Sequence, residues 1–211
     1  ADRVRVVDAP DAADVLSWMA PGLGLDTMQV LTREADRRRV DRAVAHVRDG
    51  LDLARACVPD LLDDLLPHVS SVAFLDDEDG ACPIHSATLR AVPGLLLMAE
   101  PRSAVAAAEM FVHEAAHARL FDMMMVLDLV RPGDGGTGYR PPWRGTDTTW
   151  PVEQCVAAAH AYAALAELAR SLPAGTVPAP WSLLGHAAER AAAIADWLTA
   201  HLGRLGSDAP E

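Results

Sequence analysis

The amino-acid sequence predicts an α+β domain that is predominantly helical, in which a small sheet packs on one long helix. Hydrophobic residues make up 51% of the chain and aromatic residues only 5%, and Ala, Leu and Val dominate, a profile typical of many Ala-rich helices. Apolar residues recur at helical spacing before residue 66 and after residue 100. Between residues 70 and 100, short apolar runs bounded by turn residues indicate strands.

The length of 211 residues fits a single domain over 1–211, with a helical N-terminal part over 1–66 and the remaining core over 67–211. Basic side chains number 18 and acidic side chains 30, and the resulting net charge of −12 argues against nucleic acid and anionic membranes as partners. The three cysteines show no C-x-x-C spacing, so we expect neither a disulfide framework nor a thiolate metal site. With no signal-peptide pattern and no membrane-spanning run, the expected location is the cytoplasm.

Three helices are expected in the N-terminal part, after residues 1–10, which we expect to be frayed. Asp11–Ala20 predicts a short helix that ends at a Pro-Gly pair. A longer helical pattern with both charge signs runs from about residue 26 to residue 56, and Gly50 is a candidate kink within it. Pro59 begins a third helix, PDLLDDLLPHV.

The periodicity changes after residue 67. The three predicted strands are Ser70–Leu75, Pro83–Ala91 and Gly94–Glu100, of which the last is the most apolar. Ser103 then predicts the N-cap of a long helix that continues to Val130.

The C-terminal part begins with a long loop rich in Gly and Pro, Arg131–Pro151. A loop of this length inside a compact domain is usually functional or disordered, and its aromatic residues favour a docked loop. Two Ala-rich helices follow, Val152–Ser171 and Trp181–Leu202.

The motif H-E-x-x-H lies in the long helix, within the apolar stretch MFVHEAAHARL. Residues four apart lie one turn apart on the same helix face, so the imidazoles of His113 and His117 can both reach one metal ion. Glu114 sits at the edge of that face, where it can act on a water molecule or orient a ligand. The sequence therefore predicts a metal site, against the alternative of two core histidines whose hydrogen bonds are satisfied within the protein.

Two histidines do not complete a metal site. The third-histidine pattern of short zinc proteases is absent, because Leu120 and Met123 occupy its Gly and His positions. The next helix offers His160 and, seven residues earlier on the same face, Glu153. We predict His160 as the third metal ligand and keep Glu153 as the alternative. A single histidine on an apolar helix is more often a core residue than a ligand.

Several of these segments occur together in the order seen in one known family. The chain resembles the H-E-x-x-H peptide-modification proteins of gene clusters for ribosomally made peptide natural products. The resemblance covers residues 45–170 and rests on VHEAAHARLFDMMMVLDL, YRPPWR and AAAHAYAAL. A departure, the longer TDTTW insertion, separates Trp143 from the next helix and leaves the alignment of Glu153 open.

The resemblance implies a hydroxylase that depends on iron(II) and 2-oxoglutarate and acts on a peptide side chain, with a β-carbon as the expected position. Three protein ligands leave positions for 2-oxoglutarate and O₂ on an octahedral iron. Arg144, with Arg140 second, is the candidate partner of the distal carboxylate of 2-oxoglutarate. The substrate would be a precursor peptide, extended along the predicted strand that contains His85 and Ser86. Trp143 is a further candidate for substrate binding.

The alternative chemistry is that of a zinc metallopeptidase, in which Glu114 is the general base and His160 or Glu153 completes the zinc site. A third possibility is a protein that binds peptide without catalysis, although an intact H-E-x-x-H argues against it. The predicted arrangement, a small sheet on a metal-binding helix, is zincin-like, but likeness of fold would not establish protease chemistry.

Overall fold

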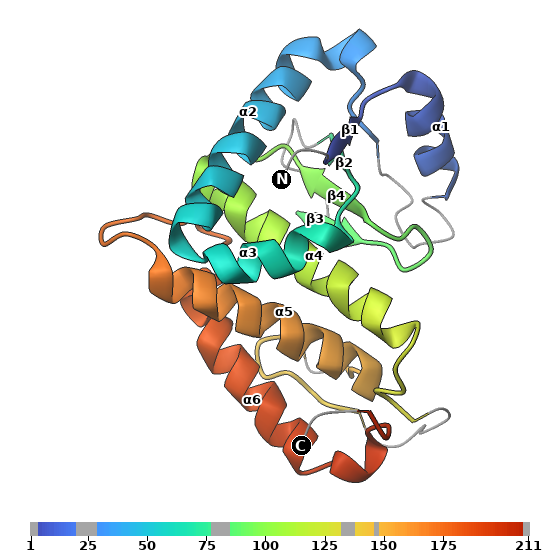
Figure 1. Ribbon diagram of the computed structural model, residues 1–211, viewed down its shortest axis with the longest axis vertical. Coiled ribbons are helices and arrows are strands. Elements are labelled where there is room, and N and C mark those ends of the chain that lie inside the picture. The colour runs from blue at the N-terminus through green and yellow to red at the C-terminus, as the bar shows by residue number, and fades with distance from the viewer. Residues whose placement is uncertain (1–3, 20–28, 77–84, 132–137, 146–147, 209–211) are drawn as a thin grey trace.

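The computed structural model describes residues 4–19, 29–76, 85–131, 138–145 and 148–208. It shows the predicted mixture of helices with a small sheet. Figure 1 shows the sheet with α1 and α2 in one half of the molecule and α5 with α6 in the other, and α4 passes between the two halves.

The sheet contains four strands in the spatial order β1 (Arg5–Val7), β2 (Ser71–Leu75), β4 (Leu95–Ala99) and β3 (Ser86–Thr88). The first three run parallel, and β3 pairs antiparallel with β4 at the edge. Side chains of β4 alternate between two cores: Leu96 and Met98 belong to the larger one, and Leu95 and Leu97 to the smaller one beside α1. Because β4 is buried on both faces, its sequence is apolar throughout, as is typical of a central parallel strand.

Two predictions about the sheet need correction. The expectation of a frayed N-terminus over 1–10 is wrong for Arg5–Val7, which forms strand β1 and pairs with β2. A run of three residues is too short to show strand periodicity in the sequence, so the strand is recognised only from its pairing with β2. The predicted strand Pro83–Ala91 is shorter in the structure, Ser86–Thr88, and residues 83–84 lie outside the described residues.

The helices are α1 (Pro10–Met19), α2 (Arg33–Cys57), α3 (Pro59–Leu65), α4 (Ala104–Met124), α5 (Val152–Ser171) and α6 (Ala187–Thr199), with the short 3₁₀ helices η2 (Leu66–His68), η3 (Leu184–His186) and η4 (Leu202–Arg204). The bounds predicted for α5 are confirmed. α2 begins later than predicted because the Thr32 hydroxyl caps it, accepting a hydrogen bond from the Ala35 amide. The predicted Ser103 cap of α4 is confirmed, but α4 ends before Val130.

Gly50 does not kink α2. The departure from helical geometry lies at Asp36, near the start of the helix. A Cβ atom on Gly50 would lie 2.8 Å from the Ala104 carbonyl oxygen and 2.8 Å from the Ala108 amide nitrogen. Glycine therefore serves here to let the α2 and α4 backbones approach closely.

α4 is buried along most of its length, with side chains such as Phe111, Val112 and Ala115 in the core. A helix that is apolar on nearly all sides is expected to lie at the centre of a domain, covered by other elements. Here α2, α3 and α5 pack against it, together with β3 and β4. None of the described helices has the length and apolar character needed to cross a membrane.

Candidate functional site

The two motif histidines project from α4 and meet. The Nε2 atoms of His113 and His117 lie 3.2 Å apart, and the ring planes are inclined at 78°. Metal–nitrogen bonds of about 2.0–2.1 Å in a tetrahedral or octahedral site place two cis nitrogens roughly 3.0–3.4 Å apart. The same separation suits a hydrogen bond between the two rings. The distance alone thus fits both two ligands of one metal ion and a pair of hydrogen-bonded histidines. The protonation state of the two rings helps to distinguish these interpretations.

The surroundings of the two rings keep both imidazoles neutral. Burial lowers the pKa of His113 to about 4. Burial also lowers the pKa of His117 to about 4, with smaller contributions from neighbouring charges that include His113 and His160. The Nδ1 atoms of both rings are buried and have no hydrogen-bond partner among the described residues. A neutral imidazole keeps one nitrogen lone pair for a metal ion, so the two facing Nε2 atoms fit as donors to a divalent cation, each Nδ1 then carrying the proton.

These pKa values predict how the metal-free protein responds to acid. Histidine in an unfolded chain titrates near 6.5, so between about pH 6.5 and pH 4 the unfolded chain binds more protons than the folded chain. The free energy of unfolding should therefore fall as the pH is lowered through this range, by about 5 kcal/mol from the two rings together. Urea unfolding of chelator-treated protein at several pH values measures the effect. The variant with His113→Leu and His117→Leu should lose distinctly less stability; equal losses would contradict the prediction.

Glu114 links the metal-motif helix to the edge strand. The residue is 2% exposed; its Oε1 accepts a hydrogen bond of 2.6 Å from the Ser86 hydroxyl, and its Oε2 accepts one of 2.7 Å from the Thr88 hydroxyl. Burial raises the pKa of the Glu114 carboxyl. Oε1 lies 3.9 Å from His113 Nε2. Ser86 and Thr88 are two apart on a strand and thus share a face, which brings both hydroxyls to one carboxylate.

Removing one of these hydroxyls should destabilise the protein. Thr88→Val keeps the shape of the side chain but leaves one oxygen of a buried carboxylate with less hydrogen bonding, at an expected cost of about 2 kcal/mol in the free energy of unfolding. Thr199→Val is the matched control, because the Thr199 hydroxyl is exposed and donates to the Ala195 carbonyl of its own helix. Chemical denaturation of both variants tests this. If Thr88→Val cost no more than the control, the contact with Glu114 would contribute little.

A groove of about 430 Å³ opens beside the histidines. It is lined by β3, the motif face of α4 and the start of α5, through Ser86, Ala87, Thr88, His113, Glu114, His117, Phe121, Pro151, Glu153, Gln154 and Ala157. Within the described chain, β3 pairs only with β4, so its outer edge borders this groove. At the surface, Arg90 Nη1 and Glu153 Oε1 form an ion pair of 2.5 Å between the end of β3 and the start of α5.

The structure does not assemble three ligands. No group of three His, Cys, Asp or Glu side chains that could hold a metal ion occurs in the described parts of the chain. His160 lies near Arg119, with 3.4 Å between His160 Nε2 and Arg119 Nη1, and burial lowers its pKa. Glu153, the alternative, lines the groove but pairs with Arg90. The identity of the third ligand stays a prediction.

The remaining predicted residues lie outside the groove. Arg140 and Arg144 are exposed and do not line it. His85 stacks on Trp181, with 4.5 Å between ring centroids, and Trp143 packs in an aromatic cluster with Tyr139 and neighbours. The expectation that the loop after α4 docks is met in its described parts, where the Tyr139 ring lies 5.6 Å from that of Trp197 in α6 and the Trp143 ring 6.2 Å from that of Tyr162 in α5.

Two polar contacts close to the motif helix were not predicted from the sequence. Glu109, one turn before His113, is 3% exposed; it accepts hydrogen bonds from the Ser182 hydroxyl and the Leu183 amide. Because Glu109 and His113 are four residues apart, the sequence already places both on the same face of the helix. Arg190 of α6 donates to the Tyr162 hydroxyl, and the Tyr162 ring lies 6.4 Å from that of His113. Nothing in the sequence around Arg190 indicates this contact.

No family model matches the chain. No curated protein matches it significantly.

Proposed function

We propose that this protein is an iron(II)- and 2-oxoglutarate-dependent hydroxylase of a peptide side chain, built on a zincin-like arrangement in which α4 is the metal-binding helix. The observation that carries the proposal is the 3.2 Å separation of the His113 and His117 Nε2 atoms beside an open groove. His113, His117 and His160 would hold the iron. With 2-oxoglutarate and O₂, bound iron would supply the oxidising power to replace a C–H bond at a β-carbon by C–OH as succinate and CO₂ form.

Glu114 has a positioning role in this proposal. Both of its oxygens accept hydroxyl hydrogen bonds from β3, which holds the carboxylate in place beside His113. Hydroxylation of a C–H bond needs no carboxylate base to activate water, so a tethered carboxylate suits it. Ser86 donates to Glu114 and also lines the groove, and it stays our candidate for contact with the peptide.

The peptide would lie along the outer edge of β3. An extended chain can add to a free strand edge through main-chain hydrogen bonds, and its side chains then alternate toward and away from the groove. This places every second side chain of a precursor peptide toward the histidine pair. The distal carboxylate of 2-oxoglutarate still needs a cationic partner, and Arg144, then Arg140, stay our candidates.

The test is an assay under controlled oxygen. Protein purified without oxygen and loaded with iron(II) is mixed with 2-oxoglutarate, O₂ and the short peptide encoded by a neighbouring gene. We expect the peptide to gain the mass of one oxygen atom and succinate to form in equal amount. The His113→Ala variant is the control and should yield neither product. Unchanged peptide with no succinate would overturn the proposal.

A zinc peptidase is the second candidate, and one distance favours it. Glu114 Oε1 lies 3.9 Å from His113 Nε2, close enough for the carboxylate to reach a water molecule beside a metal on that nitrogen. Glu114→Gln separates the candidates, because the amide cannot accept a proton from water. It should abolish peptide cleavage in a peptidase but leave measurable hydroxylation in an oxygenase.

The proposed location is the cytoplasm. Cys57 and Cys155 are free thiols in the structure, as expected in a reducing compartment. A reducing compartment would also keep iron in the iron(II) state that the proposed reaction requires.

A further inference from the structure

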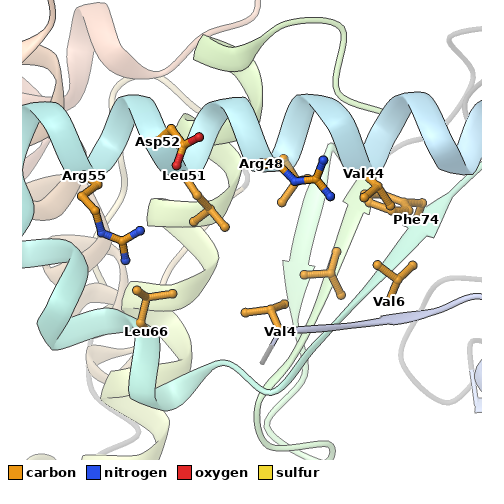
Figure 2. Close-up of a pocket in the computed structure, with 11 residues that line it drawn as sticks. Val4, Val6, Val44, Arg48, Leu51, Asp52, Arg55, Leu66 and Phe74 are labelled. Carbon is orange, nitrogen blue, oxygen red and sulfur yellow. The ribbon is translucent and has the colours of Figure 1, made fainter. Parts of the chain in front are cut away.

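A second hollow, separate from the histidine groove, lies between α2 and the β1 side of the sheet. Figure 2 shows α2 crossing above it, with Val4 and Val6 of the β1 segment, Phe74 of β2 and Leu66 below. Its volume is about 330 Å³. Because β1 and β3 are the opposite edges of the sheet, this hollow lies at the other edge from the histidine groove.

The hollow is apolar because of strand alternation and helix spacing. Side chains two apart on a strand share a face, so Val4 and Val6 both point toward α2. On α2, residues Val44, Val47 and Leu51 recur at helical spacing and complete the apolar lining.

Charged side chains of α2 stand at its rim. Arg48, Asp52 and Arg55 line the hollow and are exposed, and none of the three has an ion-pair partner among the described residues. On the same helix, by contrast, Arg42 is paired with Glu100. The rim thus carries one net positive charge in a protein whose overall charge is −12.

We propose that this hollow binds a small amphiphilic monocarboxylate, with its carboxylate paired to Arg55 and its apolar chain packed between α2 and the sheet. Figure 2 shows the Arg55 side chain directed from α2 toward the side of the hollow where Leu66 lies. Arginine pairs with carboxylates through parallel N–H···O bonds. Apolar pockets with a few charged groups at one end are the usual form of small-molecule sites.

The dimensions set the size of the ligand. The volume of about 330 Å³ lies at the lower end of the range for small-molecule sites, about 300–1,000 Å³, which favours a small ligand. Octanoate has this size and charge. Arg48 lies two helical turns before Arg55, about 10 Å along the helix axis. It therefore adds positive potential along the rim of the hollow and makes no second contact to the ligand carboxylate that Arg55 binds.

The experiment is titration calorimetry of the full chain with octanoate at low salt. We expect one-to-one binding with a Kd of about 0.1 mM. Arg55→Gln should weaken binding about tenfold and Arg48→Gln about threefold. Arg38→Gln, an exposed arginine of α2 outside the hollow, is the matched control and should bind within about twofold of the unmodified protein.

Two further measurements test the chemistry. 1-Octanol and octylammonium should bind at least about tenfold more weakly than octanoate, since neither can pair with Arg55. Val47→Trp should abolish binding by filling the hollow, with circular dichroism confirming that the variant is folded. Because Arg55 is exposed and unpaired, the Arg55→Gln variant should fold even where Val47→Trp does not. Absence of saturable binding, equal binding of 1-octanol, or no loss in Arg55→Gln would each overturn the proposal.

Discussion

Replacing His117 with alanine should lower the affinity for iron(II) or zinc by at least about 100-fold and abolish activity. The expectation follows from the 3.2 Å approach of His113 Nε2 and His117 Nε2, because either ring alone would be a monodentate ligand. Metal content after reconstitution and titration with the two ions measure the effect. Activity is followed as oxygen added to the peptide or as peptide fragments.

The matched control is His186→Ala, at an exposed histidine of η3 outside the groove. It should retain metal content and activity. The His117→Ala protein should also remain folded, because the ring it removes has a buried Nδ1 with no partner in the described structure. Equal metal binding by His117→Ala and unmodified protein would show that the pair is not a metal site.

Replacing Gly50 with valine should lower the free energy of unfolding by about 3 kcal/mol. A Cβ at this position would lie within 2.9 Å of three atoms of α4, the Ala104 carbonyl oxygen, the Ala108 amide nitrogen and the Ala107 Cβ. Two of these are backbone atoms, so relief requires the helices to move apart. Gly50→Ala should cost less, about 1 kcal/mol, because alanine also gains about 1 kcal/mol of helix propensity.

Urea denaturation gives the comparison. Ala45→Val is the control, since Ala45 is an exposed position of α2 and reports only the cost of a β-branched residue in that helix. Because α4 carries both histidines, Gly50→Val should also weaken metal binding, whereas Ala45→Val should not. Stability of Gly50→Val equal to that of Ala45→Val would show that the two helices can separate without cost.

The parts of the fold that could be predicted are those whose signal is local. The Ala-rich periodicity of α5 gave its bounds, and the Ser103 hydroxyl marked the start of α4. The strand β1 and the end of α4 before Val130 could not be predicted, because a three-residue strand has no measurable period and a helix end without a capping residue leaves no mark. The stacking of His85 on Trp181 depends on a loop nearly a hundred residues away.

The sequence by itself determined that His113 and His117 would share one face of a helix, since that relation depends only on the 3.6-residue turn. It also determined that the helix would be buried, because its flanking residues are apolar. Only the tertiary structure decided that Glu114 is held by two strand hydroxyls, that Arg90 engages Glu153, and that α2 leaves a hollow at the edge of the sheet. Those contacts join residues 26 to 63 positions apart or depend on how a helix crosses a sheet, which no local pattern encodes.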